Sequence, residues 1–352
     1  MALLFIDGYD HLAATVADLG MKYSSATSSV SVLSVVSGRV SGNGLKFQCG
    51  GGGALTLRKD LPSTYTVGTI GLAFQINANG SATWQMAGFY DSTSLQLSIG
   101  VNTSEFLTIT RGSTTLWTDT LALTPNQWYF VEFKATINNT TGTIDVWLNG
   151  SSRTSQSGLN TRNTANNQFT GIATGCLTSI TTTIGTIDDL YVCDTSTGLG
   201  SSSPVGNLRV VTSMPSGNSG DTSGHDQWSQ TGGTGGNFWT SVNEVPEDGD
   251  TSYVSSSTVN QIENFTYASL PSTVSSIKGI QFNYVARTDD AGTRQIAPSQ
   301  RNSGTDSVGS SSSNLPSGYT DTIFITETSL QTASAWTTSE FNSSEFGVKL
   351  TV

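Results

Sequence analysis

The chain has 352 residues, only 12% of them charged, and a formal net charge of −11. It contains 38 glycines and 103 serines and threonines, whereas the residues that build long amphipathic helices are scarce. The acidic balance argues against nucleic-acid binding, which needs a basic surface. No apolar run approaches the roughly 20 residues of a membrane span. We therefore expect a chain of short strands, with no nucleic-acid partner and no membrane insertion.

Alternating apolar and polar residues predict many strands in the first half of the chain. A single short, weakly patterned helix is expected from Asp10 to Tyr23. Because one face of each strand is apolar and the other polar, antiparallel sheets stacked into a sandwich are expected. The predicted strands cover residues 45–49, 54–58, 68–77, 94–101, 105–110, 115–121, 128–137, 143–149 and 184–193.

The segment from Trp128 to Gly150 carries the clearest pattern. Tyr129, Val131 and Phe133 alternate with polar or large residues, then a turn follows, and a second alternating run ends at Asn149-Gly150. Asn-Gly suits the positive φ angles of a tight hairpin turn. A β-hairpin is therefore predicted here.

A small, polar, Pro-containing stretch around residues 194–206 reads as a domain boundary. We expect a first sandwich over residues 1–200, a linker over 201–206 and a second β-sandwich over 207–352. The second half restarts with a predicted strand at Leu208–Val211, then an alternating run over 280–287 that turns into 293–296, and it closes on a strand over 346–352. Residues 205–352 hold six basic and 14 acidic side chains, which suits a solvated, displayed domain.

The three cysteines form no CxxC pair, and a Cys176–Cys193 disulfide on neighbouring strands is conceivable but not required. No Glu-x-Asp-x-x-Glu string of the kind that places two carboxyl groups for glycoside hydrolysis occurs, and no nucleophile elbow. Glu247–Asp250 is better explained as a solvated turn than as a calcium loop, and Asp221, His225 and Asp226 lack a further convergent ligand. We therefore predict no catalytic residue, no cofactor and no enzymatic activity, and the residues that bind a ligand stay unassigned. Among the tryptophans, Trp147 is expected on the face of its strand opposite the apolar residues, and it is therefore the candidate for stacking on a sugar.

The Trp128–Gly150 hairpin, followed by Ile187-Asp188-Asp189-Leu190-Tyr191-Val192, resembles the laminin-G-like branch of the concanavalin A-like sandwiches. The resemblance implies an all-β jelly roll that serves attachment and recognition more than chemistry. Some laminin-G-like modules bind calcium, so Asp188 and Asp189 are candidate calcium ligands. The alternative is that one of them orders a neighbouring turn, because adjacent residues on a strand face opposite sides.

The opening Phe5-Ile6-Asp7-Gly8-Tyr9-Asp10-His11 is similar to that of structural proteins of tailed bacteriophages. Segments of the second half (248–254, 276–281, 286–294, 335–337 and 346–348) resemble a stretch common in phage virion proteins. The resemblance implies a non-enzymatic virion component, such as a capsid decoration, spike or tail-associated protein, assembled in the host cytoplasm beside other capsid or tail proteins. The alternative is a carbohydrate-binding module that recognises a host surface glycan.

Two Gly/Ser/Thr-rich loops, Met214–Gly236 and Ser299–Ser317, bury too little apolar surface to order themselves. If they are ordered, contacts from outside the domain order them, and closed homo-oligomers are the usual source of such contacts. We therefore expect a homo-oligomer, with a trimer favoured by analogy with other phage surface proteins.

Overall fold

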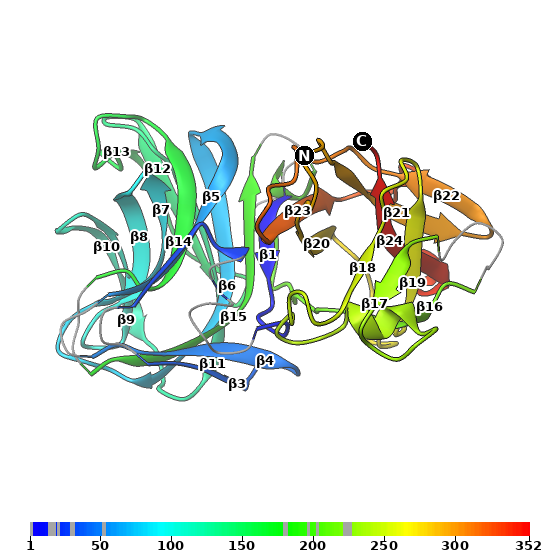
Figure 1. Cartoon of the computed structure of the whole chain (residues 1–352). Helices are drawn as coiled ribbons and strands as arrows, with labels where there is room; N and C mark the ends of the chain where they lie inside the picture. The colour runs from blue at the N-terminus through cyan, green and yellow to red at the C-terminus, as the bar shows by residue number, and fades with distance from the viewer. Residues whose placement is uncertain are drawn as a thin grey trace. The chain divides into compact units, whose positions relative to one another are not determined.

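The computed structural model describes residues 3–12, 19, 22–28, 32–50, 54–178, 182–195, 198–201, 204–220 and 227–352. The chain divides into two compact units, Met1–Thr212 and Ser213–Val352. The first unit runs from blue to green in Figure 1 and the second from green to red. Each unit is built from antiparallel sheets, which confirms the all-β class expected from the composition.

One sheet of the first unit, called sheet A here, holds the predicted hairpin at one end. Its strands follow this order in space, with β1 (Leu3–Asp7) pairing with β15 beside the main path: β13 (Ser151–Leu159), β12 (Gly142–Leu148), β11 (Trp128–Thr136), β6 (Val67–Ala78), β15 (Ile184–Asp194), β4 (Asn43–Gln48) and β3 (Val32–Ser37).

The second sheet of this unit, sheet B, has seven strands and carries the site described below. Their order is β10 (Thr114–Ala122), β9 (Phe106–Arg111), β8 (Ser94–Val101), β7 (Trp84–Asp91), β14 (Phe169–Cys176), β5 (Leu55–Tyr65) and β2 (Ser25–Ser28).

The two sheets meet in a core of large aromatic side chains. Phe89 of sheet B lies 5.5 Å, centroid to centroid, from Phe133 of sheet A, and Trp84 of sheet B lies 6.4 Å from Phe74. All four rings are fully buried. Such burial contributes roughly 1.5–3 kcal/mol for each large apolar side chain, so this interface is the main source of stability in the unit. The first unit is therefore a β-sandwich.

The predicted hairpin is present. β11 pairs with β12 in unbroken register from Val131–Leu148 to Thr136–Thr143, and Asn149 has a φ of 50° at the turn. The core-facing residues Val131, Phe133 and Ala135 are fully buried.

The cysteine pairing differs from the one considered from the sequence. The disulfide joins Cys49, next to the end of β4 in sheet A, to Cys176, the last residue of β14 in sheet B. Cys193 is buried in β15, outside this disulfide. Sequence spacing could not show this, because the partners come from different sheets and are 127 residues apart.

The stretch that was expected to link the units lies on the first unit instead. Glu132 accepts hydrogen bonds from the backbone N–H groups of Val205 (2.6 Å) and Gly206 (3.1 Å). Asp189 accepts one from Val210 at 2.7 Å. Because these bonds satisfy the backbone of residues 205–210 with side chains, Leu208–Val211 forms no strand. The first unit accordingly extends to Thr212 rather than to residue 200.

The second unit contains a five-stranded sheet and two smaller pairs. The five-stranded sheet has the order β16 (Pro215–Asn218), β19 (Ile262–Tyr267), β24 (Ser344–Leu350), β21 (Ile296–Asn302) and β22 (Thr305–Val308). The pairs are β17 (Ser229–Thr231) with β18 (Tyr253–Ser255), and β20 (Ile280–Ala286) with β23 (Thr320–Thr326).

An aromatic cluster fills the space beside the five-stranded sheet. Phe282, Trp336 and Phe346 are buried together, and Tyr284 and Phe324 pack around them. The expected strand over 280–287 is β20, but it pairs with β23 rather than turning into residues 293–296. The last expected strand is β24, which ends at Leu350.

The fully described helices are short: η1 (Gly198–Ser201), η2 (Phe238–Ser241) and α2 (Thr338–Ser343). The helix expected from Asp10 to Tyr23 lies largely outside the described residues. Among the described helices, none has the length and apolar character needed to cross a membrane.

Candidate functional site

The face of sheet B that points away from the sandwich core carries an unusual set of polar side chains. Along β7, Phe89 points into the core and pairs with Leu97, which is also fully buried. Because side chains alternate along a strand, Gly88 lies on the opposite face, paired with Ser98 of β8. Figure 1 shows β7 and β8 side by side in this sheet.

One row of cross-strand partners crosses this outer face. Arg58 of β5 pairs with Ala173, Ala173 with Gly88, Gly88 with Ser98, and Ser98 with Thr110. Gly88 has no room for a side chain, because a Cβ there would lie 2.7 Å from the Leu95 side chain. Because Ala173, Gly88 and Ser98 are small, longer side chains on either side of this row form most of the outer surface.

Polar side chains on β7, β8 and β9 form a short hydrogen-bonded chain on this face. Gln85 Nε2 donates to Thr110 Oγ1 at 2.9 Å, and the hydroxyls of Thr110 and Ser98 lie 2.8 Å apart. Gln85 is 7% exposed, yet its Oε1 atom is buried without a hydrogen-bond partner, as is Oγ1 of Thr108. An unpaired buried acceptor costs the folded state about 1–3 kcal/mol.

Arg58 supplies the cation on this face. One of its terminal nitrogens is paired with Asp60, two residues along β5, while its Nε is buried without a hydrogen-bond partner. The guanidinium therefore still has donor capacity.

Apolar side chains lie next to these polar groups. Tyr90, Ala173 and Leu177 form a buried cluster, and Leu95 packs against it. Burial raises the pKa of the Tyr90 phenol, while Arg58 acts in the opposite direction. Tyr90 is consequently a neutral ring and hydroxyl at physiological pH. We call the set of Arg58, Gln85, Tyr90, Ser98, Thr108 and Thr110 the sheet B site.

The sheet B site offers donors, acceptors and an aromatic ring within one patch. Polar groups placed beside apolar and aromatic side chains are typical of small-ligand sites. A ligand with both hydroxyl groups and apolar C–H faces matches this combination.

The two acidic residues proposed as calcium ligands are both engaged by Arg39. Asp189 accepts a hydrogen bond from Arg39 Nε at 2.8 Å, and Asp188 accepts one from the Arg39 backbone N–H at 2.8 Å. A register shift in β15 after Asp188, with a φ of 52° at Asp189, brings both carboxyl groups to the same region. Strict strand alternation, which was assumed from the sequence, does not hold at this bulge.

Burial and the neighbouring Asp189 charge raise the pKa of Asp188 to about 7. Asp189 also has a raised pKa, because burial outweighs its ion pair with Arg39. Among the described residues, no three His, Cys, Asp or Glu side chains are grouped so that they could hold a metal ion. The two carboxyl groups hold Arg39 and the 205–210 segment in place through hydrogen bonds.

Other sequence candidates occupy structural positions. Asp248 accepts hydrogen bonds from the backbone and hydroxyl of Ser252, which is the arrangement of a turn. Trp147 lies half-buried on the outer side of sheet A, paired with Glu132. Residues 221–226, which include Asp221, His225 and Asp226, lie outside the described residues.

The residues of the sheet B site carried little signal in the sequence. They come from four strands, and β5 is joined to β7 through β14, which is distant in the chain. The one local signal is the Trp84–Asp91 run, which is buried at every position. Burial at every position shows that other residues of this chain lie over its outer side.

Comparison with protein-family models and with curated proteins found no match. Among solved structures, the chain is similar to the alginate lyase Aly36B at 10% identity and a TM-score of 0.37, over 53% of this chain and 95% of the lyase. It is similar to the sialidase of Trypanosoma rangeli at 14% identity and a TM-score of 0.34, over 46% of this chain and 27% of the sialidase. It is also similar to a carbohydrate esterase from the Shiga toxin-encoding bacteriophage phi24B, at 16% identity and a TM-score of 0.35, over 54% and 99% of the two chains.

These comparisons correct one expectation from the sequence. We predicted no enzymatic activity, yet the similar solved structures are named as carbohydrate-processing enzymes. The absence of one acidic motif was too narrow a criterion, because it addresses a single mechanism of glycan cleavage. At these TM-scores the likeness assigns no activity, substrate or family to this chain.

Proposed function

We propose that the first unit binds a carbohydrate at the sheet B site and that the chain is a component of a bacteriophage particle. The observation that carries the first part is the buried, unpartnered Oε1 of Gln85 on the same face of sheet B as Arg58 and the Tyr90 ring. Sugars present hydroxyl groups to such polar atoms and C–H faces to such rings. The similar solved structures are of carbohydrate-active proteins, which agrees with this choice of ligand class.

Binding of the full chain to a glycan array identifies the carbohydrate. Substitution Gln85→Met keeps the side-chain volume and removes the amide, so we expect about tenfold weaker binding from the loss of one or two hydrogen bonds. Tyr90→Leu should weaken binding to a similar degree by removing the ring.

Trp147→Leu is the matched control, because Trp147 lies on the outer side of the other sheet. We expect it to bind the same glycans with unchanged affinity. Loss of binding in Trp147→Leu with retention in Gln85→Met would place the ligand on sheet A and contradict the proposal.

The second part of the proposal is supported by the phage-like segments, which lie at the N-terminus and through the second unit. The chain would then assemble with other virion proteins as a closed oligomer, with its acidic second unit displayed. Mass spectrometry of purified particles should find the chain at a fixed ratio to the major capsid or tail protein, and light scattering should give three times the chain mass. Absence from the particles would contradict the virion role, and a monomeric mass would contradict the oligomer.

A further inference from the structure

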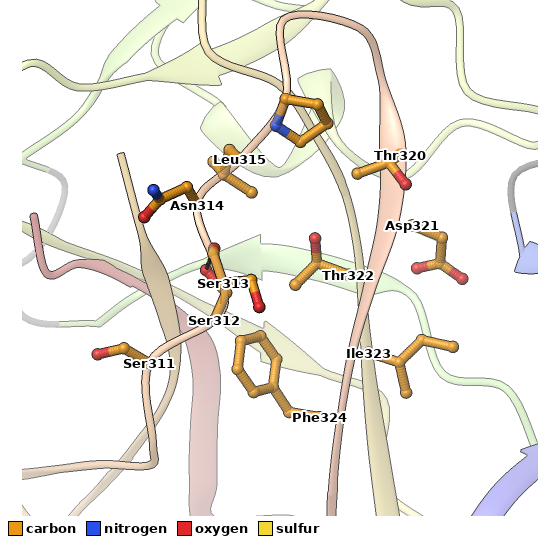
Figure 2. Close-up of a pocket in the computed structure, with 11 residues that line it drawn as sticks. Ser311, Ser312, Ser313, Asn314, Leu315, Thr320, Asp321, Thr322, Ile323 and Phe324 are labelled. Atoms are coloured by element: carbon orange, nitrogen blue, oxygen red, sulfur yellow. Dashed lines mark hydrogen bonds between the residues drawn. The ribbon is translucent and has the colours of Figure 1, made fainter. Parts of the chain in front are cut away.

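The second unit contains a cavity of about 400 Å³ that has no part in the sheet B site. One wall is the loop Ser311–Pro316 and the other is strand β23, which follows it in the chain (Figure 2). A cavity of this size lies within the range of about 300–1,000 Å³ seen for small-ligand sites.

The cavity exists because the backbones of its two walls are bonded elsewhere. Ser312 N–H donates to the Ile296 carbonyl at 2.7 Å, and Leu315 N–H donates to the Arg294 carbonyl at 2.8 Å. β23 pairs along its whole length with β20. Among the described residues, no backbone hydrogen bond joins the loop to β23, so the two walls stay apart.

The side chains that face the cavity are mostly hydroxyls and apolar groups. Figure 2 shows Thr322 and Phe324 on the loop side of β23, and Asp321 and Ile323 of the same strand also belong to the lining. The hydroxyl of Thr322 has no hydrogen-bond partner in the described structure, and the same holds for the hydroxyl of Ser313. A ring and hydroxyl-bearing side chains therefore line the two walls of the cavity.

Asp321 adds a carboxylate to the cavity lining, and the two nearby arginines are each paired with an aspartate. Arg294, whose carbonyl accepts the hydrogen bond from Leu315, forms an ion pair with Asp290 at 2.6 Å. Arg287 pairs with Asp250 at 2.8 Å and stacks on Tyr319, the residue before β23. An anionic ligand would find no uncompensated cation here, and this half of the chain has an acidic excess.

We propose that this cavity is a second, separate binding site that accepts one unit of an uncharged saccharide. The sugar hydroxyls bond to Ser313 and Thr322, and a C–H face of the sugar lies on Phe324. Hydroxyl-to-hydroxyl bonding beside an aromatic ring suits a neutral sugar better than a peptide, whose backbone would need ordered N–H and C=O partners.

The test uses the isotopically labelled full chain and NMR titration with the neutral methyl glycosides of glucose, galactose, mannose and N-acetylglucosamine. Within the second unit we expect amide shifts confined to residues 311–324 for at least one neutral glycoside, and none for glucuronate. Thr322→Val is isosteric and removes one hydroxyl, so it should weaken that binding about five- to tenfold. Thr305→Val, the same change at an exposed residue of β22 outside the cavity lining, should leave it unchanged.

Three results would overturn the proposal: no shift in residues 311–324 with any neutral glycoside, preferential binding of glucuronate, or equal affinity of Thr322→Val and the unsubstituted chain. Displacement of the sugar by a short extended Ser/Thr peptide that binds more tightly would assign the cavity to a peptide instead. The Gln85→Met substitution separates this site from the first one, since it should weaken sugar binding to the first unit only.

Discussion

The two units reach stability by different routes from the same Ser/Thr/Gly-rich composition. In the first unit, the largest fully buried side chains include Trp84, Phe89 and Phe133, each with 0% exposure. In the second unit the most buried aromatic, Trp336, retains 3% exposure, and Phe282 retains 8%.

The second unit compensates with hydrogen-bonded side chains inside its sheet. Gln300 is fully buried and accepts from the backbone N–H groups of Leu330 (2.9 Å) and Gln331 (3.2 Å). Its Nε2 donates to Ser344 Oγ at 3.1 Å. The second unit, with less apolar burial, thus draws more of its stability from hydrogen-bonded buried side chains, whereas the first unit draws it from buried apolar area.

The largest difference between the units should come from the disulfide, because all three cysteines lie in the first unit. Closing a loop of 127 residues between Cys49 and Cys176 should contribute about 5 kcal/mol in the chain-entropy account. Reduction, or the pair Cys49→Ala and Cys176→Ala, should therefore lower the free energy of unfolding of the first unit alone. Hydrogen exchange read separately for residues 3–212 and 213–352 measures this, and equal loss in both units would contradict it.

Two tryptophans allow the cores to be compared directly. Trp84 Nε1 donates to the Gly175 carbonyl at 2.7 Å, and its ring packs onto Gly185 of sheet A, where a Cβ would lie 2.2 Å from it. Trp336 Nε1 is buried without a hydrogen-bond partner. Trp84→Phe should cost about 3 kcal/mol and Trp336→Phe about 1 kcal/mol, since only the first loses a hydrogen bond as well as volume. Chemical denaturation followed by hydrogen exchange tests the order, and the reverse order would refute the account of the two cores.

The buried Gln300 side chain allows the contribution of hydrogen bonds in the second unit to be measured. Gln300→Met keeps the apolar volume but leaves Leu330 and Gln331 without an acceptor, so the second unit should lose about 2 kcal/mol. Gln156→Met, on the edge strand β13 of the first unit, is the control and should change the stability by less than about 0.5 kcal/mol. Equal effects would mean that the Gln300 network is not a source of stability.

The sequence predicted those strands in which apolar and polar residues alternate. β6, β8, β11 and β12 alternate and were recognised, whereas β7 contains the unbroken run Met86–Tyr90 and was missed, as was β14. The polar edge strand β13 was missed because it has no apolar face, and β21 because its second half was assigned to the Ser299–Ser317 loop.

The candidate sites were beyond sequence reasoning for a different physical reason. Arg58 shares one sheet face with Gln85, Ser98 and Thr110 only because β14 lies between β5 and β7 in sheet B. The cavity in the second unit depends on where the loop 311–316 places its hydrogen bonds. The Asp188-Asp189 pair was found, but its bulge and its pairing with Arg39 were not, since a positive φ at Asp189 is not visible in the sequence.

The smallest predicted effect is a pH dependence confined to the first unit. The pKa of Asp188 is about 7 in the folded chain, whereas an unfolded aspartate titrates at about 3.9. Between these values the folded state keeps the proton and the unfolded state has lost it, so this contribution to stability is complete at low pH and disappears as the pH rises through 7. From pH 6 to pH 8 the first unit should lose about 1 kcal/mol through this group.

Asp188→Asn, which cannot ionise, should be less stable overall because its amide cannot accept from both Arg39 and Asp189, yet its stability should change less over this range. Asp290→Asn in the second unit is the control and should retain the full pH dependence of the first unit. Parallel pH profiles for Asp188→Asn and the unsubstituted chain, measured by denaturation at each pH, would mean that Asp188 ionises in the folded state at its ordinary pKa and that Arg39 outweighs its burial.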